Sequence, residues 1–376
     1  MRPSLIHDKN CYRCYSSVMS TRVLVAMSGG VDSSVTAFLM QKEGFDCTGV
    51  MMKLFGSDDI GESGGKTCCS LSDSRDARNV ALKLGIPFFV YNFSDAFREQ
   101  VIERFVESYQ MGLTPNPCID CNRYIKFNRL LERAEFFDFD YIATGHYAQI
   151  EKDISSGRYL LKKGVYTEKD QSYVLYMMTQ NQLAHTLFPL GHLTKPEVRV
   201  FAKEQGFTNA HKAESQDICF VPNGDYADFI ERHTGKVCAP GFMTDTEGAV
   251  LGEHKGILRY TIGQRRGIGV STSGPPLYVC STCVKTNTVV LGTEKNLFSR
   301  SLTAADINLI PFEKIDKPLK VKAKIRYRQV EQSATVEQTG ENTVHVEFDQ
   351  PQRAITKGQA LVMYDGDIVV GGGTII

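Results

Sequence analysis

Hydrophobic and polar positions alternate in two different ways along the chain. In the first half, short apolar runs over residues 23–27, 46–54, 86–93 and 141–144 predict strands, and apolar residues at helical spacing between them predict helices. Strands that alternate with helices are typical of an α/β domain with a parallel sheet. From Gly235 onward, helical spacing nearly disappears, and short alternating runs separated by turns predict an all-β region.

The middle of the first half carries a predicted helix and a predicted loop. Apolar residues at helical spacing over residues 97–109 predict the helix. Residues 112–122 follow it and contain Pro115 and Pro117, which we expect to forbid helix and to stiffen the loop. This loop displays two thiols and is therefore a candidate site.

Two further elements follow from local signals. Residues 147–168 predict a hairpin around a Ser-Ser-Gly turn. Thr194 and Glu197 have the spacing of a capping box, which predicts a helix that Gly206 ends. The first domain is expected to end near this point.

Composition limits the classes of protein. The chain has 376 residues, 42% of them hydrophobic, which is enough for two or three globular domains. The 43 basic and 43 acidic residues balance, so any nucleic-acid surface has to come from local clustering of charge. No apolar run approaches the roughly 18 residues of a membrane span, so we expect no membrane partner. Residues 1–20 lack the apolar stretch of a secretory signal and are predicted to be a disordered tail, with a weak transit peptide or a start at Met19 as the alternatives.

One such local cluster lies in the all-β region. Basic residues occupy alternate positions from Lys320 to Arg328, with apolar residues between them. As a single strand, this segment would bury one face and present five cations on the other. It is either a phosphate-binding stripe or a solvated strand whose cations pair with nearby acids.

The cysteines indicate thiol chemistry more than a disulfide framework. The chain has 11 cysteines but is large and lacks a secretory signal, so reduced thiols are expected. Three pairs have Cys-x-x-Cys spacing: Cys11 with Cys14, Cys118 with Cys121, and Cys280 with Cys283. The last pair lies in a predicted strand and is expected to be buried or surface thiols.

The candidate nucleotide site is the turn Ser28-Gly29-Gly30-Val31-Asp32-Ser33 between the first strand and helix. Glycines permit a tight turn, and the free amides at the start of a helix attract anions. The turn lacks the Gly-Lys-Ser/Thr of a P-loop and the spacing of the dinucleotide fingerprint. It resembles the loop of ATP pyrophosphatases, enzymes that cleave ATP to AMP and pyrophosphate.

Further segments, taken in order, are similar to one family, the tRNA-specific 2-thiouridylases. The matching segments are 27–34, 51–53, 114–117, 121–122 with 125–127, 143–147, 169–173, 214–220 and 326–328. The resemblance implies ATP-dependent replacement of the C2 oxygen of the wobble uridine by sulfur, with release of AMP and pyrophosphate. It implies a Rossmann-like PP-loop domain over residues 21–210, a small central domain over 211–292 and an antiparallel β-barrel over 293–376.

The resemblance also implies roles for individual residues. The implied ATP contacts are Ala26, Met27, Ser28, Gly29, Gly30, Val31, Asp32, Ser33, Met52 and Gly145. The implied tRNA contacts are Asn116, Pro117, Cys118, His146, Lys169, Asp170, Gln171, Arg326, Tyr327 and Gln359. Cys121 stands at the position of the family's nucleophile and Cys219 at the position of its persulfide. Mg²⁺ is the implied metal, with Asp32 helping to hold it.

Two mechanisms of sulfur transfer stay open. In one, a persulfide on Cys219 supplies the sulfur and Cys121 releases it by forming a disulfide. In the other, Cys118, Cys121 and Cys219 hold a [4Fe-4S] cluster with one open iron. Many family members have an acidic residue at the position of Cys118, so this chain has a third thiol, and three thiols are the number that such a cluster needs.

The resemblance implies partners and a compartment as well. These are tRNAs of the Lys, Glu and Gln type, a cysteine desulfurase or sulfur carrier, and the bacterial cytoplasm or an organelle matrix, and we expect a monomer. The competing functions are a PP-loop amidating synthetase acting on a small molecule and a non-catalytic tRNA-binding protein. An amidating synthetase would have no use for paired thiols or a basic β-domain.

Overall fold

The computed structural model describes most of the chain, and the described residues fall in two compact units. The described residues are 20–56, 71–212, 218–221 and 224–376, so residues 1–19 of the predicted tail lie outside them. The described residues of the first unit are 20–56, 71–95 and 122–212, and those of the second unit are 96–121, 218–221 and 224–376. No helix in these ranges is long and apolar enough to cross a membrane.

The first unit is built on a five-stranded parallel sheet in the order β3-β2-β1-β4-β7. The strands are β1 Arg22–Ala26, β2 Asp46–Lys53, β3 Phe88–Asn92, β4 Tyr141–Ala143 and β7 Thr186–Leu187. The order of the strands changes direction between β1 and β4, and ligands of α/β sheets bind at the carboxyl ends of strands beside such a point. The predicted α/β fold is confirmed.

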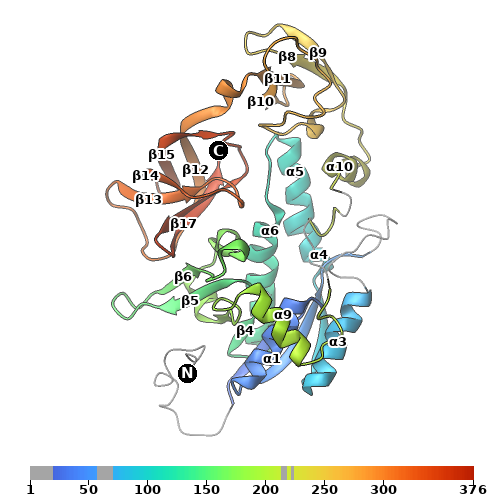
Figure 1. The fold of residues 1–376 in the computed structure, drawn as a ribbon, viewed down its shortest axis with the longest axis vertical. Helices are drawn as coiled ribbons and strands as arrows, with labels where there is room; N and C mark the ends of the chain where they lie inside the picture. The colour runs from blue at the N-terminus through green and yellow to red at the C-terminus, as the bar shows by residue number, and fades with distance from the viewer. Residues whose placement is uncertain (1–19, 57–70, 213–217, 222–223) are drawn as a thin grey trace. The chain divides into compact units, whose positions relative to one another are not determined.

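Helices pack on this sheet around an apolar core. They include α1 Val31–Lys42, α3 Leu71–Leu84, α7 Leu130–Phe136 and α9 Lys195–Glu204. Helix α1 packs against both α3 and α9 (Figure 1). Val23, Val25 and Val35 are fully buried in the core between sheet and helices. The predicted capping box is confirmed, because the Thr194 hydroxyl accepts from the Glu197 amide and the Glu197 carboxylate accepts from the Thr194 amide.

The predicted hairpin is also confirmed. Strands β5 Ala148–Lys152 and β6 Tyr159–Lys163 pair antiparallel. Short turns of 3₁₀ helix, η3 Thr167–Lys169 and η4 Ser172–Leu175, follow the hairpin, and then come the short helix α8 Gln180–Ala184 and β7.

The predicted helix over residues 97–109 is present, but the loop prediction for residues 112–122 is wrong from Pro117 onward. The helical elements are α4 Ser94–Phe97, the π-type stretch η1 Arg98–Glu103, α5 Arg104–Gln110, α6 Pro117–Asp120 and the π-type stretch η2 Cys121–Arg129. Pro117 is the first residue of α6, where a helix needs no backbone N–H and where the fixed φ of proline suits it. Asn116 caps this helix by accepting from the Cys118 amide at 3.2 Å. Cys118 and Cys121 therefore lie on helical backbone.

Later in the second unit, helix α10 Tyr226–Thr234 is followed by a small sheet. The sheet has the order β10-β11-β8-β9, with β8 Gly241–Thr244, β9 Val250–His254, β10 Tyr278–Cys283 and β11 Thr288–Gly292. Strand β11 pairs parallel with β8, and the other two pairs are antiparallel. Met243, Val279 and Val289 are fully buried at its centre. A short 3₁₀ turn, η5 Ile257–Arg259, lies between β9 and β10, and another, η6 Glu294–Leu297, follows β11.

The C-terminal residues form a closed antiparallel barrel, as expected. Its strands are β12 Phe298–Leu309, β13 Leu319–Lys324, β14 Gln332–Gly340, β15 Thr343–Arg353, β16 Ala360–Asp365 and β17 Ile368–Ile375. They follow the order β12-β15-β14-β13-β16-β17, and β12 also pairs with β17, which closes the barrel. Closure leaves no open edge in this sheet.

The predicted stripe of five cations on one strand is wrong in its second half. Strand β13 ends at Lys324, and residues 325–328 turn away from it. Lys320 and Lys322 are exposed on the strand as predicted, but the Arg326 guanidinium donates to the carbonyl of Arg353. Alternation alone could not reveal this end, because a turn and a strand both tolerate the pattern over a few residues.

The second unit supplies a test of its aromatic core. Phe220 is 1% exposed, and its ring centroid lies 5.3 Å from those of Phe105 and Phe229 and 5.8 Å from that of Phe97. We expect Phe220→Ala to lower the free energy of unfolding by about 3–5 kcal/mol, because it removes this contact area and leaves a cavity. Urea denaturation measures the change. Phe136→Ala, at a side chain 73% exposed, is the matched control, and equal losses in both variants would contradict the packing.

Candidate active site

The turn between β1 and α1 is held by contacts that only glycine permits. At Gly29 the backbone φ is +76°, and a Cβ atom there would lie 2.3 Å from the carbonyl oxygen of Asp73. Gly30 is the N-cap of α1, and no side chain of the described residues caps the helix there. The first amides of a 12-residue helix are therefore left for another acceptor, which is the arrangement that binds phosphate.

Serine hydroxyls close this turn from within. The Ser33 hydroxyl accepts from the Ser28 amide at 3.1 Å and donates to the Gly30 carbonyl at 3.1 Å. The Ser34 hydroxyl also donates to the Gly30 carbonyl, at 2.9 Å. Ser28 itself is exposed, so its hydroxyl is accessible to a ligand of the turn.

Asp32 makes the strongest polar contacts at the start of α1. Lys195 Nζ lies 2.7 Å from Asp32 Oδ1 and 2.8 Å from Oδ2, and the Tyr147 hydroxyl donates to Oδ1 at 2.8 Å. The Lys195 side chain is 8% exposed and that of Asp32 is 31% exposed. A single carboxylate in reach of a triphosphate suits Mg²⁺, which is held through one or two carboxylates together with phosphate oxygens. Asp32 therefore fits the implied metal, provided that Lys195 yields at least one of its oxygens.

A second group of side chains holds the turn at Gly29. Its carbonyl accepts from Asn209 Nδ2 at 3.0 Å and from Lys212 Nζ at 3.3 Å, and Asn209 Nδ2 also reaches the Ser34 hydroxyl at 2.9 Å. Lys212 Nζ pairs with Asp73 at 2.5 Å and with Asp76 at 2.6 Å. Partial burial disfavours the charged form of Lys212, but the hydrogen bonds and charges of the two aspartates prevail and raise its pKa.

The residues after β4 lie against the start of α1, as the sequence predicts for Gly145. A Cβ atom on Gly145 would lie 3.1 Å from the Asp32 carbonyl carbon and 3.2 Å from the Ser33 nitrogen, so this position favours glycine. The neighbouring His146 is buried, with its Nδ1 2.7 Å from the Thr144 hydroxyl and its ring beside Phe127 and Phe188. Burial, with a smaller contribution from the charge of Lys126, holds the pKa of His146 well below its usual 6.5.

The remaining first-unit positions that the resemblance implies are Met52, Lys169, Asp170 and Gln171, and two of them make hydrogen bonds near Tyr147. Asp170 accepts from the Gly164 amide at 3.1 Å and from the Ser172 hydroxyl at 2.8 Å, and Gln171 accepts from the Tyr147 amide at 3.0 Å. The Gln171 contact orients the backbone of Tyr147, whose hydroxyl donates to Asp32. Lys169 and Met52 are partly exposed.

All three thiols of the predicted sulfur site belong to the second unit. Cys118 is exposed, Cys121 is 9% exposed and Cys219 is partly exposed. Among the described residues, no three His, Cys, Asp or Glu side chains are grouped so as to hold a metal ion. The three thiols therefore do not form a cluster site in this conformation.

The second unit also brings Gln359 to the segment before α6. Gln359 Nε2 donates to the Thr114 carbonyl at 2.8 Å, and the Thr114 amide donates to the Lys357 carbonyl at 2.9 Å. This barrel turn fixes the backbone that leads to Asn116 and Pro117. Tyr327 is 38% exposed, in the turn that follows β13.

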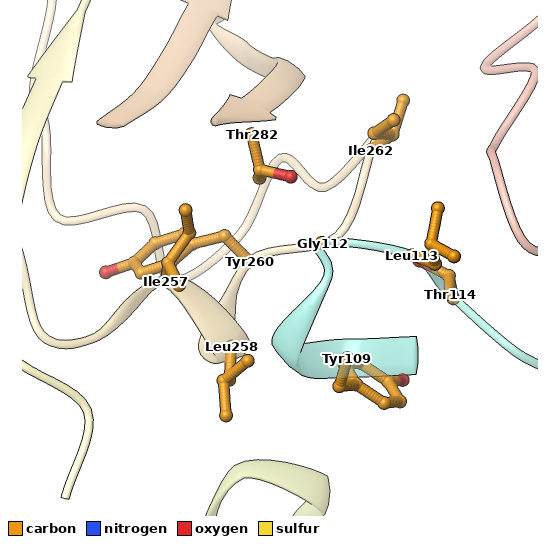
Figure 2. Close-up of a pocket in the computed structure, with 9 residues that line it drawn as sticks. All are labelled: Tyr109, Gly112, Leu113, Thr114, Ile257, Leu258, Tyr260, Ile262 and Thr282. Atoms are coloured by element: carbon orange, nitrogen blue, oxygen red, sulfur yellow. The ribbon is translucent and has the colours of Figure 1, made fainter. Parts of the chain in front are cut away.

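A pocket lies on the same segment of the second unit. Figure 2 shows Tyr109 to Thr114 meeting the residues around Ile257 and Tyr260, with Thr282 completing the lining. The pocket is partly open to solvent. None of the predicted site residues lines this pocket.

Comparison with known proteins places the chain in a family. Residues 21–223 match the family described as tRNA methyl transferase HUP domain, residues 227–293 its PRC-barrel domain, and residues 299–375 the aminomethyltransferase beta-barrel domain. The tRNA-specific 2-thiouridylase MnmA of Clostridioides difficile is 53% identical over 357 residues, which cover 95% of this chain and 98% of that protein. The enzyme of the same name from Acetivibrio thermocellus is 50% identical, covering 94% and 99%.

The chain belongs to the tRNA-specific 2-thiouridylase family. Among solved structures, a 4-thiouridine synthetase–RNA complex with bound ATP has a TM-score of 0.35 and 19% identity, over 54% of this chain and 46% of that one. The NMN synthetase of Francisella tularensis has a TM-score of 0.33 and 18% identity, over 58% and 79%. These structural likenesses are weak.

In this member of the 2-thiouridylase family, the site is completed by four residues to which sequence patterns assigned no role. They are Tyr147, Lys195, Asn209 and Lys212, and each contacts the turn from more than 100 positions away. Two indirect signals were present in the sequence. The family-like segment 143–147 includes Tyr147, and the capping box that starts α9 fixes where Lys195 begins the helix.

The buried histidine generates a pH prediction. Because the folded pKa of His146 is lowered, the unfolded chain binds a proton below pH 6.5 that the folded chain does not, and stability falls as the pH falls. We expect this histidine to contribute a loss of up to about 1.4 kcal/mol for each pH unit below its unfolded pKa. Urea unfolding at pH 7, 6 and 5 measures it, and His146→Gln should show a flatter profile. His185→Gln, in the same unit, is the control, and unchanged profiles in both variants would contradict the assignment.

Proposed function

We propose that this protein catalyses ATP-dependent 2-thiolation of the wobble uridine in tRNA. The observation that carries the proposal is the match to curated 2-thiouridylases over 95% of the chain, with an uncapped helix start at the turn where that family is expected to bind ATP. The three-domain division at residues 210 and 292 belongs to the same proposal.

The nucleotide would bind at the turn after β1. The amides at the start of α1 and the hydroxyls of Ser28 and Ser33 would donate hydrogen bonds to the phosphate oxygens, and Met52 and Gly145 would flank the nucleoside. Ala26, Met27, Gly29, Gly30 and Val31 supply the backbone of this cradle. Bound Mg²⁺ would neutralise charge on the pyrophosphate leaving group. Asp32 is the carboxylate that would hold it.

Thiolation then proceeds in three displacements. The uracil C2 oxygen attacks the α-phosphorus of ATP, the bond to pyrophosphate breaks, and the oxygen becomes part of an AMP leaving group. The terminal sulfur of a persulfide on Cys219 attacks C2, and AMP leaves. The Cys121 thiolate attacks the Cys219 sulfur, which leaves sulfur on the base and forms a Cys121–Cys219 disulfide that an external thiol reduces.

The chain residues implied to face tRNA divide into two kinds. Lys169, Cys118 and Tyr327 have exposed or partly exposed side chains that could contact the nucleic acid directly. His146, Asp170 and Gln171 would act by shaping the backbone around Tyr147, since His146 is buried and the two others accept backbone hydrogen bonds. Asn116, Pro117, Arg326 and Gln359 set the geometry of the second-unit segments.

Partners and compartment follow from the same proposal. The substrates are tRNAs of the Lys, Glu and Gln type, and the sulfur comes from a cysteine desulfurase or a sulfur carrier. We propose that the protein acts as a monomer in a bacterial cytoplasm. Its relatives from Clostridioides difficile and Acetivibrio thermocellus are bacterial proteins, which supports a bacterial setting.

The cysteines provide the main test. We expect Cys121→Ser and Cys219→Ser each to lower thiolation of unmodified tRNA at least about 1000-fold, because a hydroxyl cannot carry or release the sulfur. Affinity for tRNA should change less than about twofold, because neither substitution alters charge. Mass analysis of the wobble nucleoside and a filter-binding assay measure the two effects.

Controls separate the cysteine roles. Cys283→Ser, on β10, should retain full activity, and Cys118→Ser should retain activity if two thiols suffice. Substantial thiolation by Cys219→Ser would contradict the persulfide route.

A second test distinguishes thiolation from amidation of a small molecule. We expect pyrophosphate release from ATP to depend on tRNA that carries a wobble uridine. Release driven by a carboxylate and ammonia in the absence of tRNA would overturn the proposed function. A tRNA whose wobble uridine is replaced by cytidine is the matched control substrate and should give only background release.

A further inference from the structure

Lys195 occupies a place where a lysine is electrostatically unfavourable by itself. It is the first residue of α9, a helix of 10 residues, and its side chain is 8% exposed. The start of a helix carries a partial positive charge, so a cation there is repelled instead of stabilised. A buried charge also needs a partner to compensate for lost hydration. The position therefore requires an anion.

The anion in the structure is Asp32, which cannot fully balance its surroundings. Asp32 is the second residue of α1, so its single negative charge lies beside the positive end of α1 and beside Lys195 Nζ. The Glu197 carboxylate caps α9 and offsets the positive end of that helix, whereas no side chain of the described residues caps α1. One lysine and the start of α1, which contributes about half a positive charge, thus exceed the single carboxylate of Asp32, and the site retains a positive balance that a polyanion would satisfy.

The geometry offers a way to exchange partners. Lys195 Nζ contacts both oxygens of Asp32, whereas the Tyr147 hydroxyl contacts only Oδ1, at 2.8 Å. If Lys195 Nζ turns toward a phosphate, Tyr147 still holds the orientation of the carboxylate. The freed oxygen Oδ2 is then accessible as a ligand for a divalent cation.

We propose that Lys195 is a phosphate-binding residue that exchanges Asp32 for the β- and γ-phosphate oxygens of the bound triphosphate. This inference rests on the proposed function, since it assumes that the turn binds ATP. In the chain without nucleotide, the pair with Asp32 holds the Lys195 side chain in place. With nucleotide, the ammonium stabilises the charge that develops on the departing pyrophosphate.

The test compares ligands that differ in phosphate number, without tRNA. For Lys195→Met, we expect the affinity for ATP and for pyrophosphate, measured by titration calorimetry, to fall about 10- to 100-fold, as for the loss of one charge-assisted hydrogen bond. The affinity for AMP should change less than about twofold, since AMP lacks the β- and γ-phosphates. Lys195→Arg should recover part of the loss. Lys203→Met, at an exposed position of the same helix, is the matched control and should bind all three ligands as the native chain does.

A second pair of variants keeps the test decisive if Lys195→Met does not fold. In EDTA, Asp32→Asn removes repulsion of pyrophosphate and frees Lys195, so pyrophosphate should bind more tightly than to the native chain. Adding Lys195→Met to Asp32→Asn removes both charges together and should cost about 10- to 100-fold of that affinity. Equal affinity in the single and double variants would show that Lys195 only pairs with Asp32 and would overturn the inference.

The outcomes separate this inference from the proposed function. A native chain that thiolates tRNA, with variants whose ATP and pyrophosphate affinities are unchanged, contradicts the role of Lys195 alone. The expected affinity losses in a chain that does not thiolate tRNA support the role of Lys195 and contradict the proposed function. A native chain that binds neither ATP nor pyrophosphate overturns both.

Discussion

The close approach of Gly29 to the Asp73 carbonyl is the constraint on which the proposed nucleotide site depends. A Cβ atom would lie 2.3 Å from that oxygen, so any other residue would push the turn off helix α3. The same peptide presents its carbonyl to Asn209 and Lys212, which fixes its orientation. With the carbonyl held inward, the amides that follow are directed by α1, and the turn is organised before any ligand arrives. Preorganised donors of this kind cost no rearrangement when charge develops on a phosphate.

Local sequence patterns were sufficient for the elements whose causes are local. The strands, the hairpin and the capping box at Thr194 each depend on residues within a few positions of one another, and the structure contains them all. The helix at Pro117 was missed because proline is excluded from the interior of a helix but suits its first position. The sequence did not show that a helix starts at Pro117 itself. The end of β13 at Lys324 was missed because the Arg326 contact to the Arg353 carbonyl is a tertiary one.

The turn could be recognised from sequence, whereas the charges around it could not. Asp32 and Lys195 are separated by 163 positions, and Gly29 and Lys212 by 183. No periodicity connects residues at such distances, and a lysine that starts a helix has no sequence signal distinguishing it from a surface lysine. The family resemblance named the turn, Met52 and Gly145, and the structure adds the side chains that hold the turn in shape.

The charge balance of the chain bears on how it would hold tRNA. With 43 basic and 43 acidic residues, the whole molecule does not attract a polyanion at long range. Recognition would therefore depend on local cations such as Lys320 and Lys322, both exposed on β13, and on the shape of the bound anticodon arm. Each cation that neutralises a phosphate releases a counterion, so the salt dependence of tRNA affinity counts such contacts. The Arg326 guanidinium donates a hydrogen bond to the Arg353 carbonyl. Arg326 would therefore contribute to tRNA binding by positioning the turn that carries Tyr327. A chain with balanced charge would select tRNA through the few sites where exposed cations lie on backbone whose shape also fits the nucleic acid.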